Sequence, residues 1–439
     1  MILAQGVIAV ASVVALFGMA DGVRRLGQVR GWSPETQRKT VHVGVGVHAM
    51  ALPLVVDRSG FLMFVVLALG ALVILRLPSV RSEGAGASIH AVGRRSWGDV
   101  LFLVAVTVLF LRAAGDPALY TLPLAVLTLS DAAAAVIGTQ YGRRWFGGAA
   151  RTKSVEGTVT FFVITWMLAV AILIQATPVP RPNVVALATV VAAMAAVIEA
   201  ESWHGLDNLF VPVGVHILLM IWGEANPLIL GTIALSWLVA LSAASRLSAW
   251  LGVTRHTVRI LFITLFLTAT VTGVVGAMPT ALAVLGYLAA RVRLVTDATG
   301  HDLDFVAVLV LVGIFWLGVG ALTHVSALDY FTMTCCALAA GYAVLAVGDR
   351  PEVLRLAAAG AAIGAVVVIH QSVSGVLAPE AHWRSTTVTA VGCTLSAATC
   401  TLAAVWRPRL VFGAAAPAWR LAGLALLVPI VTYAGELWR

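Results

Sequence analysis

The chain is a succession of apolar runs, each bounded by charged residues, proline or glycine. An α-helix of about 20 apolar residues is long enough to cross the hydrocarbon core of a bilayer. The pattern therefore predicts an all-α, polytopic integral membrane protein with roughly sixteen transmembrane helices. The expected spans are 2–20, 41–57, 60–78, 99–114, 118–138, 155–176, 183–200, 209–222, 226–245, 258–277, 279–295, 304–323, 327–347, 353–377, 385–405 and 418–435.

The distribution of Arg and Lys predicts the orientation of these helices, because cytosolic loops carry an excess of positive charge. Alternate loops contain 23 of the 28 positive residues, and the opposite loops contain Arg58, Arg112, Arg181, Arg384 and Arg439. The basic loops are therefore expected in the cytosol and both termini outside. The expected location is a cell membrane of the bacterial inner-membrane type.

Composition agrees with a membrane protein: 60% of residues are hydrophobic, 11% are charged, and the mean hydropathy is +0.98. The net charge of +8 fits loops that face anionic lipid headgroups, and no basic tail indicates nucleic acid. The first span is expected to be retained, since its basic residues follow the apolar run, unlike those of a signal peptide. The four cysteines lack metal-ligand spacing and are expected in the core.

The polar motifs concentrate before residue 213, which predicts two functional parts. Residues 1–225 are expected to form a catalytic membrane domain, and residues 226–439 an additional eight-helix domain of unknown role. The second part has its own polar candidates, and for the intramembrane His370 packing is the simpler interpretation. These are Asp297, His301, Asp302, Asp304, His324, Asp329, His370 and Gln371.

Arg38, Lys39 and His42 open the second predicted span, where spacings of three and four place His42 on one helical face with both bases. They form a candidate anion site. Interfacial anchoring by long basic side chains is the alternative. A second basic cluster, 94–99, ends in Asp99 at the start of a span, and helix entry explains most of it.

Residues 130–157 combine acid, glycine and base in a chain that otherwise avoids charge. Asp131 lies within a predicted span, where an ionisable group is costly and suggests function, here a cation ligand. Ala135, Gly138 and Gly142 continue its helical face and would allow close approach of backbone or ligand. The basic residues that follow are Arg143, Arg144, Arg151 and Lys153, one of only two lysines in the chain.

A lysine beside a glycine-bearing loop is typical of phosphate sites. Ser154, Glu156 and Gly157 then open the next span, where Glu156 could instead simply complement the helix dipole. A last cluster, 199–212, is acidic against the positive-inside trend. It contains Glu199, Glu201, His204, Asp207 and Asn208, and its carboxylates suit Mg²⁺ shared with substrate phosphates.

In order and spacing these clusters resemble the CTP-dependent polyprenol kinases, which include phytol kinase and dolichol kinase and are distantly similar to phosphatidate cytidylyltransferases. The resemblance covers residues 36–222. The matching segments are Arg38-Lys39-x-x-His42, Ser130-Asp131-Ala132 through Gly138 and Tyr141-Gly142-Arg143, Lys153-Ser154-x-Glu156-Gly157, and Glu201 with Asp207-Asn208-Leu209-x-Val211-Pro212.

The resemblance implies transfer of the γ-phosphate of CTP to an isoprenoid alcohol at the cytosolic membrane face, with a divalent metal such as Mg²⁺. It implies that Asp131, Glu201 and Asp207 hold the metal or position the triphosphate. Phosphate oxygens would be neutralised by Lys153, Arg143 and Lys39. The candidate catalytic residues are Asp131, Lys153, Glu156, Glu201 and His42, and the candidate nucleotide-binding residues are Lys39, Arg38, Gly138, Gly142, Arg143, Ser154, Gly157 and Asn208.

Several alternatives stay open on sequence alone. The general base could be Glu156, Glu199, His42 or Asp99. This chain has Ser130 where many relatives have glycine, and it adds eight helices, which leaves the alcohol undetermined. A cytidylyltransferase, a transporter or flippase, and a non-catalytic membrane scaffold are the competing classes, and a homo-oligomer is left open.

Overall fold

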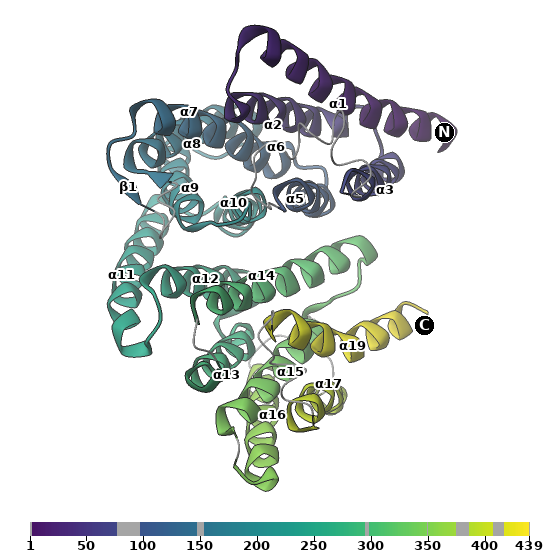
Figure 1. Cartoon of the computed structure of the whole chain (residues 1–439), viewed down its shortest axis with the longest axis vertical. Coiled ribbons are helices and arrows are strands. Elements are labelled where there is room, and N and C mark those ends of the chain that lie inside the picture. Colours follow the sequence, from purple (N-terminus) through teal and green to yellow (C-terminus); the bar gives the residue numbers. More distant parts are fainter. Residues whose placement is uncertain are drawn as a thin grey trace. The chain divides into compact units, whose positions relative to one another are not determined.

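A computed structural model describes residues 2–76, 97–146, 153–294, 298–348, 350–374, 386–406 and 417–438. These residues form two compact units, Met1–Ser236 and Trp237–Arg439, and the boundary falls within one long helix, α11 (Pro227–Leu251) (Figure 1). The functional roles predicted for the two parts stay predictions.

The first unit begins with α1 (Ile2–Arg30), α2 (Pro34–Ala51), the 3-10 turn η1 (Leu52–Leu54), α3 (Arg58–Leu75) and α5 (Gly98–Arg112). It continues with α6 (Pro117–Ala125), the π-helical turn η2 (Val126–Ser130), α7 (Asp131–Tyr141), and a small antiparallel pair of β1 (Trp145–Phe146) and β2 (Lys153–Ser154). The remaining helices are α8 (Val155–Ala176), α9 (Arg181–Glu201), α10 (Asp207–Trp222) and the first part of α11.

The second unit contains the rest of α11 and seven further described helices: α12 (Arg255–Gly276), α13 (Met278–Leu294), α14 (Ala298–Thr323), α15 (Leu328–Val347), α16 (Glu352–Ser374), α17 (Thr386–Trp406) and α19 (Pro417–Leu437). Helix α15 packs against α13, α14, α16, α17 and α19. Cys335 and Cys336 on α15 and Cys393 and Cys400 on α17 are all buried and free, which confirms their prediction as core residues.

The polar candidates of the second unit include one that has a structural role. Asp302 on α14 is completely buried and accepts two hydrogen bonds from the Arg291 guanidinium and one from the Tyr287 hydroxyl. Arg291 also donates to the Gly252 carbonyl, where the chain turns from α11 to α12. This network ties α13 to α14 and to the preceding turn. Asp297 lies outside the described residues.

The structure is all-α apart from the small β pair, as the hydrophobic pattern predicts. Twelve helices of the described residues are long and apolar enough to cross a membrane, and α10 is apolar but shorter. Each predicted span overlaps a helix, but the count of sixteen crossings and the side of the termini stay predictions. The helix predicted at 41–57 is shifted: α2 begins at Pro34, because Ser33 caps it by accepting a hydrogen bond from the Thr36 amide.

Helices α6, η2 and α7 form one long segment with two irregularities. Pro123 has no N–H and cannot bond the carbonyl of Leu119, which instead pairs with Nδ1 of the buried His216 on α10, at 2.8 Å. The π-helical turn that follows inserts an extra residue and ends directly before Asp131. The Thr165 hydroxyl on α8 donates to Ser130 at this point. The π-helical turn thus sets the direction in which the Asp131 side chain leaves the helix.

Glycines allow α7 and α8 to pack closely. A Cβ placed on Gly157 would lie 3.0 Å from the Ala134 carbonyl oxygen and 3.4 Å from the Cα of Gly138. The Ser154 hydroxyl, which caps α8 by accepting from the Gly157 amide, occupies the same space. These two glycines therefore have a packing role, and a role for them in nucleotide binding stays a prediction.

We predict that Gly157→Ala destabilises the protein, because the added methyl group meets backbone atoms that cannot move without separating the helices. Overpacking of this kind typically costs about 1–3 kcal/mol. The matched control is Gly70→Ala on α3, where the methyl group has open space and should be neutral or slightly stabilising. Thermal unfolding in detergent should show a lower Tm for Gly157→Ala alone, and equal Tm values for both variants would contradict the prediction.

Candidate functional site

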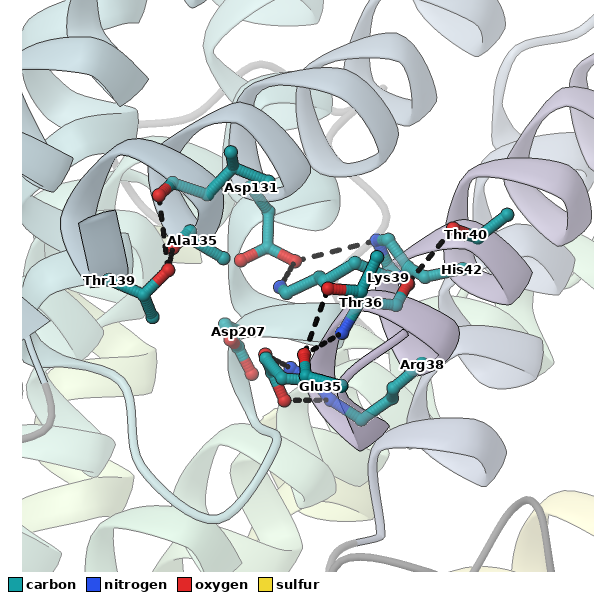
Figure 2. Close-up of polar contacts among 12 residues, drawn as sticks. Glu35, Thr36, Arg38, Lys39, Thr40, His42, Asp131, Ala135, Thr139 and Asp207 are labelled. Carbon is teal, nitrogen blue, oxygen red and sulfur yellow. Dashed lines mark hydrogen bonds and ion pairs between the residues drawn. The ribbon is translucent and has the colours of Figure 1, made fainter. Parts of the chain in front are cut away.

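A buried ion pair joins α2 to α7. Lys39 and Asp131 are each 7% exposed, and the Lys39 ammonium donates to Oδ2 of Asp131 at 2.5 Å. Figure 2 shows Lys39 and His42, one helical turn apart on α2, both directed at this carboxylate. The predicted shared face is confirmed for Lys39 and His42, which meet at Asp131, whereas Arg38 pairs with Glu35. The predicted anion site stays a prediction.

His42 is held in one tautomer by its neighbours. Its Nε2 lies 3.2 Å from the Leu127 carbonyl oxygen in the π-helical turn and 3.5 Å from Oδ2 of Asp131. Both neighbours are acceptors, so Nε2 must carry the proton. In the neutral ring the lone pair then belongs to Nδ1.

A second ion pair lies at the start of α2, beside the first. The Arg38 guanidinium donates two hydrogen bonds to the Glu35 carboxylate, and both side chains are more than a third exposed. Arg38 holds the pKa of Glu35 below its usual range, while Glu35, followed by Asp131 and Asp207, raises the pKa of Arg38. Figure 2 shows Asp207 near this pair. Arg38 is therefore available at the edge of the cluster, whereas Lys39 is enclosed.

The β1–β2 pair positions the second lysine of the chain. Phe146 pairs with Lys153, and the Val155 amide donates to the Arg144 carbonyl. The Glu156 carboxylate closes the base of this hairpin by accepting from the Arg143 amide at 3.0 Å and the Arg144 amide at 3.4 Å. Gly142 ends α7 at the same place. Arg151 and the glycines at 147 and 148 lie outside the described residues.

Lys153 reaches from the hairpin to acidic groups on two other elements. Its ammonium forms an ion pair with Glu199 on α9 and lies 4.0 Å from Oδ2 of Asp207 at the start of α10. Burial alone would lower the pKa of Lys153, but Glu199, Asp207 and Asp131 outweigh it and raise the pKa to about 12. Lys153 is therefore cationic at neutral pH.

Glu199 is the residue whose importance the sequence motifs understated. They emphasised Glu201, but Glu199 is only 4% exposed and makes the ion pair with Lys153. Glu199 lies on one helical face with the buried Val184, Val191 and Ala195. Residue 201 follows a second buried face of the same helix, so apolar periodicity alone does not separate the two glutamates. Glu201 lies at the C-terminal end of α9.

These contacts assemble a cluster of alternating charge from four parts of the first unit: α2, α7, the hairpin with α9, and α10. Three bases, Lys39, Arg38 and Lys153, each pair with a carboxylate. An anion with several oxygens could replace the carboxylates on Arg38 and Lys153, and a cation bound with it could pair with the carboxylates that are released. The arrangement is therefore suited to binding a polyphosphate together with a cation.

Comparison with known proteins gives one informative relative. No protein-family model matches the chain, and no solved structure matches it. The chain is 30% identical over 184 residues to the phytol kinase of Synechocystis sp., an alignment that covers 41% of this chain and 76% of that protein.

The chain belongs to the phytol kinase family. This agrees with the family resemblance seen in the sequence motifs, whereas a relationship to phosphatidate cytidylyltransferases is not shown. At family level the membership indicates a kinase of isoprenoid alcohols.

The remaining predicted site residues of this phytol kinase family member lie around the cluster. Asn208 follows Asp207 on α10, and its amide donates to the Gly98 carbonyl at the start of α5, at 2.8 Å. Asp99, in the first turn of α5, forms an ion pair with Arg76. Within the described residues no three His, Cys, Asp or Glu side chains lie close enough together to hold a metal ion, so the predicted set of Asp131, Glu201 and Asp207 is not a preformed cage.

We predict that Lys39→Met destabilises the protein by about 3–5 kcal/mol, because it leaves the Asp131 carboxylate buried without its partner. The double variant Lys39→Met/Asp131→Leu should recover most of this loss, since both charges are gone. Arg38→Met is the matched control and should cost less than about 1 kcal/mol, because its pair with Glu35 is close to half exposed and reaches solvent. Denaturant titrations in detergent measure all three. A double variant no more stable than Lys39→Met would argue against the pairing.

Proposed function

We propose that the first unit transfers the γ-phosphate of CTP to the hydroxyl group of an isoprenoid alcohol at the cytosolic face of the membrane. The observation that carries the proposal is the charged cluster itself, in which Asp131 and Lys153 lie together with partners from other elements of a phytol kinase family member. Phosphoryl transfer depends mainly on positioning and charge stabilisation, which such a cluster supplies.

The bases of the cluster would bind the triphosphate. Lys153 is tied to the hairpin by its backbone, so its ammonium can exchange Glu199 for a phosphate oxygen while the backbone stays in place. Arg38 is the more exposed base and can leave Glu35 in the same way. Lys39 is enclosed, so we assign it to holding Asp131.

The acidic residues suit a divalent cation that arrives with the nucleotide. Mg²⁺ usually takes one or two carboxylates and completes its shell with substrate phosphates and water, so the absence of a three-ligand group among the described residues fits this mode. Asp207 is the more accessible ligand, with Asp131 behind it, since their side chains are 22% and 10% exposed. Bound there, Mg²⁺ would neutralise charge on the phosphates.

His42 is our candidate for the general base. Asp131 and the Leu127 carbonyl fix the proton on Nε2, which leaves Nδ1 to accept the proton of the alcohol. The alcohol oxygen would form a bond to the γ-phosphorus while the bond from that phosphorus to the β-bridging oxygen breaks and CDP leaves. The other candidate bases are engaged elsewhere: Glu156 with backbone amides, Glu199 with Lys153, and Asp99 with Arg76.

The function is tested with CTP labelled at either the α or the γ phosphate. Purified protein is incubated with Mg²⁺ and either a long-chain isoprenoid alcohol or phosphatidate. We expect the γ label, and only the γ label, to enter the alcohol. Incorporation of the α label into phosphatidate would instead identify a cytidylyltransferase, and incorporation of neither label would refute transfer from CTP to these acceptors.

We expect Asp131→Asn and Lys153→Ala each to abolish turnover, because the first removes the charge that organises the site and the second removes a phosphate-binding cation. His42→Gln should lower kcat by about 100-fold, the usual scale for a general base, and leave KM for CTP nearly unchanged. Elution as a monodisperse species in detergent controls for folding. Full activity in any of these variants would remove that residue from the mechanism.

A further inference from the structure

Trp97 is an exposed aromatic residue directly before Gly98, whose carbonyl contacts Asn208 next to the charged cluster. It immediately precedes α5 and is 61% exposed, whereas Lys39, Asp131 and Glu199 of the charged cluster are buried. The Arg76 guanidinium at the end of α3 covers one face of the indole ring, with its Cζ 4.4 Å from the ring centroid. Because the indole is exposed, a second planar group could stack on the ring in addition to the Arg76 guanidinium.

The Arg76 side chain is fixed in this position from the other side. It forms an ion pair with Asp99, which lies two residues after Trp97 in the first turn of α5. A guanidinium that stacks on an indole and pairs with a carboxylate holds the ring in one orientation. The three side chains therefore make a rigid surface, formed by the ends of α3 and α5.

A short series of contacts connects this surface to the phosphate-binding residues. Gly98, the residue after Trp97, accepts a hydrogen bond from Asn208, and the preceding residue, Asp207, lies 4.0 Å from the Lys153 ammonium. Trp97 and Lys153 are thus connected through Gly98, Asn208 and Asp207, and the indole itself makes none of the cluster's ion pairs. In a nucleoside triphosphate the base and the γ-phosphate are at opposite ends of the molecule, so one nucleotide needs two separate contact points of this kind.

We propose that Trp97, backed by Arg76, is the stacking platform for the base of the nucleotide. The proposal rests on the proposed function in that the phosphates of the same nucleotide lie at Lys153. Stacking on an indole is tolerant of the base, because every base has a π face. The platform therefore contributes affinity for nucleotides over inorganic polyphosphates, and Asp99 acts as a positioning residue through Arg76.

The test is equilibrium binding of labelled CTP to the full-length protein in lipid nanodiscs with Mg²⁺, which does not require turnover. Trp97→Leu keeps an apolar side chain and removes the aromatic face, and should raise Kd for CTP about tenfold. Displacement of the label by inorganic tripolyphosphate should give the same inhibitor constant in wild type and variant, because that probe has no base. Trp97→Phe should restore most of the CTP affinity.

Trp406→Leu is the matched control, because Trp406 is 71% exposed at the end of α17 and lies in the other unit. If Trp97 only anchors the protein at the membrane interface, both Leu variants will bind CTP like the wild type, which would overturn the proposal. Equal weakening of CTP and tripolyphosphate by Trp97→Leu would also overturn it, as would a wild type that binds tripolyphosphate and no nucleotide. A wild type that binds CTP through Trp97 and transfers no phosphate would refute the proposed function and leave the platform standing.

Discussion

The buried ion pair between Lys39 and Asp131 is the interaction on which the first unit depends. Two charges at 2.5 Å in a nearly solvent-free position stabilise each other only while both are present, and either one alone would be costly. The pair therefore locks α2 to α7 at one relative position. The same carboxylate helps to fix the tautomer of His42. A single acidic residue thus positions two bases that come from another helix.

The sequence predicted the fold well where the physics is local. Apolar runs located all the described helices, and the small-residue face of Asp131, Ala135 and Gly138 predicted a close approach, which α8 fills. It predicted less where contacts between distant segments decide the outcome. The start of α2 depends on the Ser33 cap, and the hairpin that carries Lys153 is too short to leave a strand pattern. A two-residue strand has no periodicity to read.

The candidate site shows the same division. Charge indicated that Asp131 needed explanation, because ionisable groups are rare within membrane spans, and composition singled out Lys153 as one of only two lysines. Their partners could not be read from spacing: Lys39 precedes Asp131 by 92 positions and Lys153 precedes Glu199 by 46. Motif reasoning emphasised Glu201, whose role stays a prediction, whereas Glu199 makes the ion pair with Lys153. The family resemblance gave the order of the motifs along the chain. Which base pairs with which carboxylate depends on how the helices pack, and the structure gives those pairs.

The π-helical turn at Val126–Ser130 has a consequence for how this site is specified. One extra residue in a helix rotates everything after it by about 100° relative to everything before it. The direction of the Asp131 side chain is therefore fixed by a count of residues as much as by their chemistry, since the turn separates it from the part of the helix that α10 holds through Leu119. In this segment the number of residues therefore matters as much as their identity, because the loss of any one residue would change the helical phase and turn the Asp131 carboxylate away from Lys39.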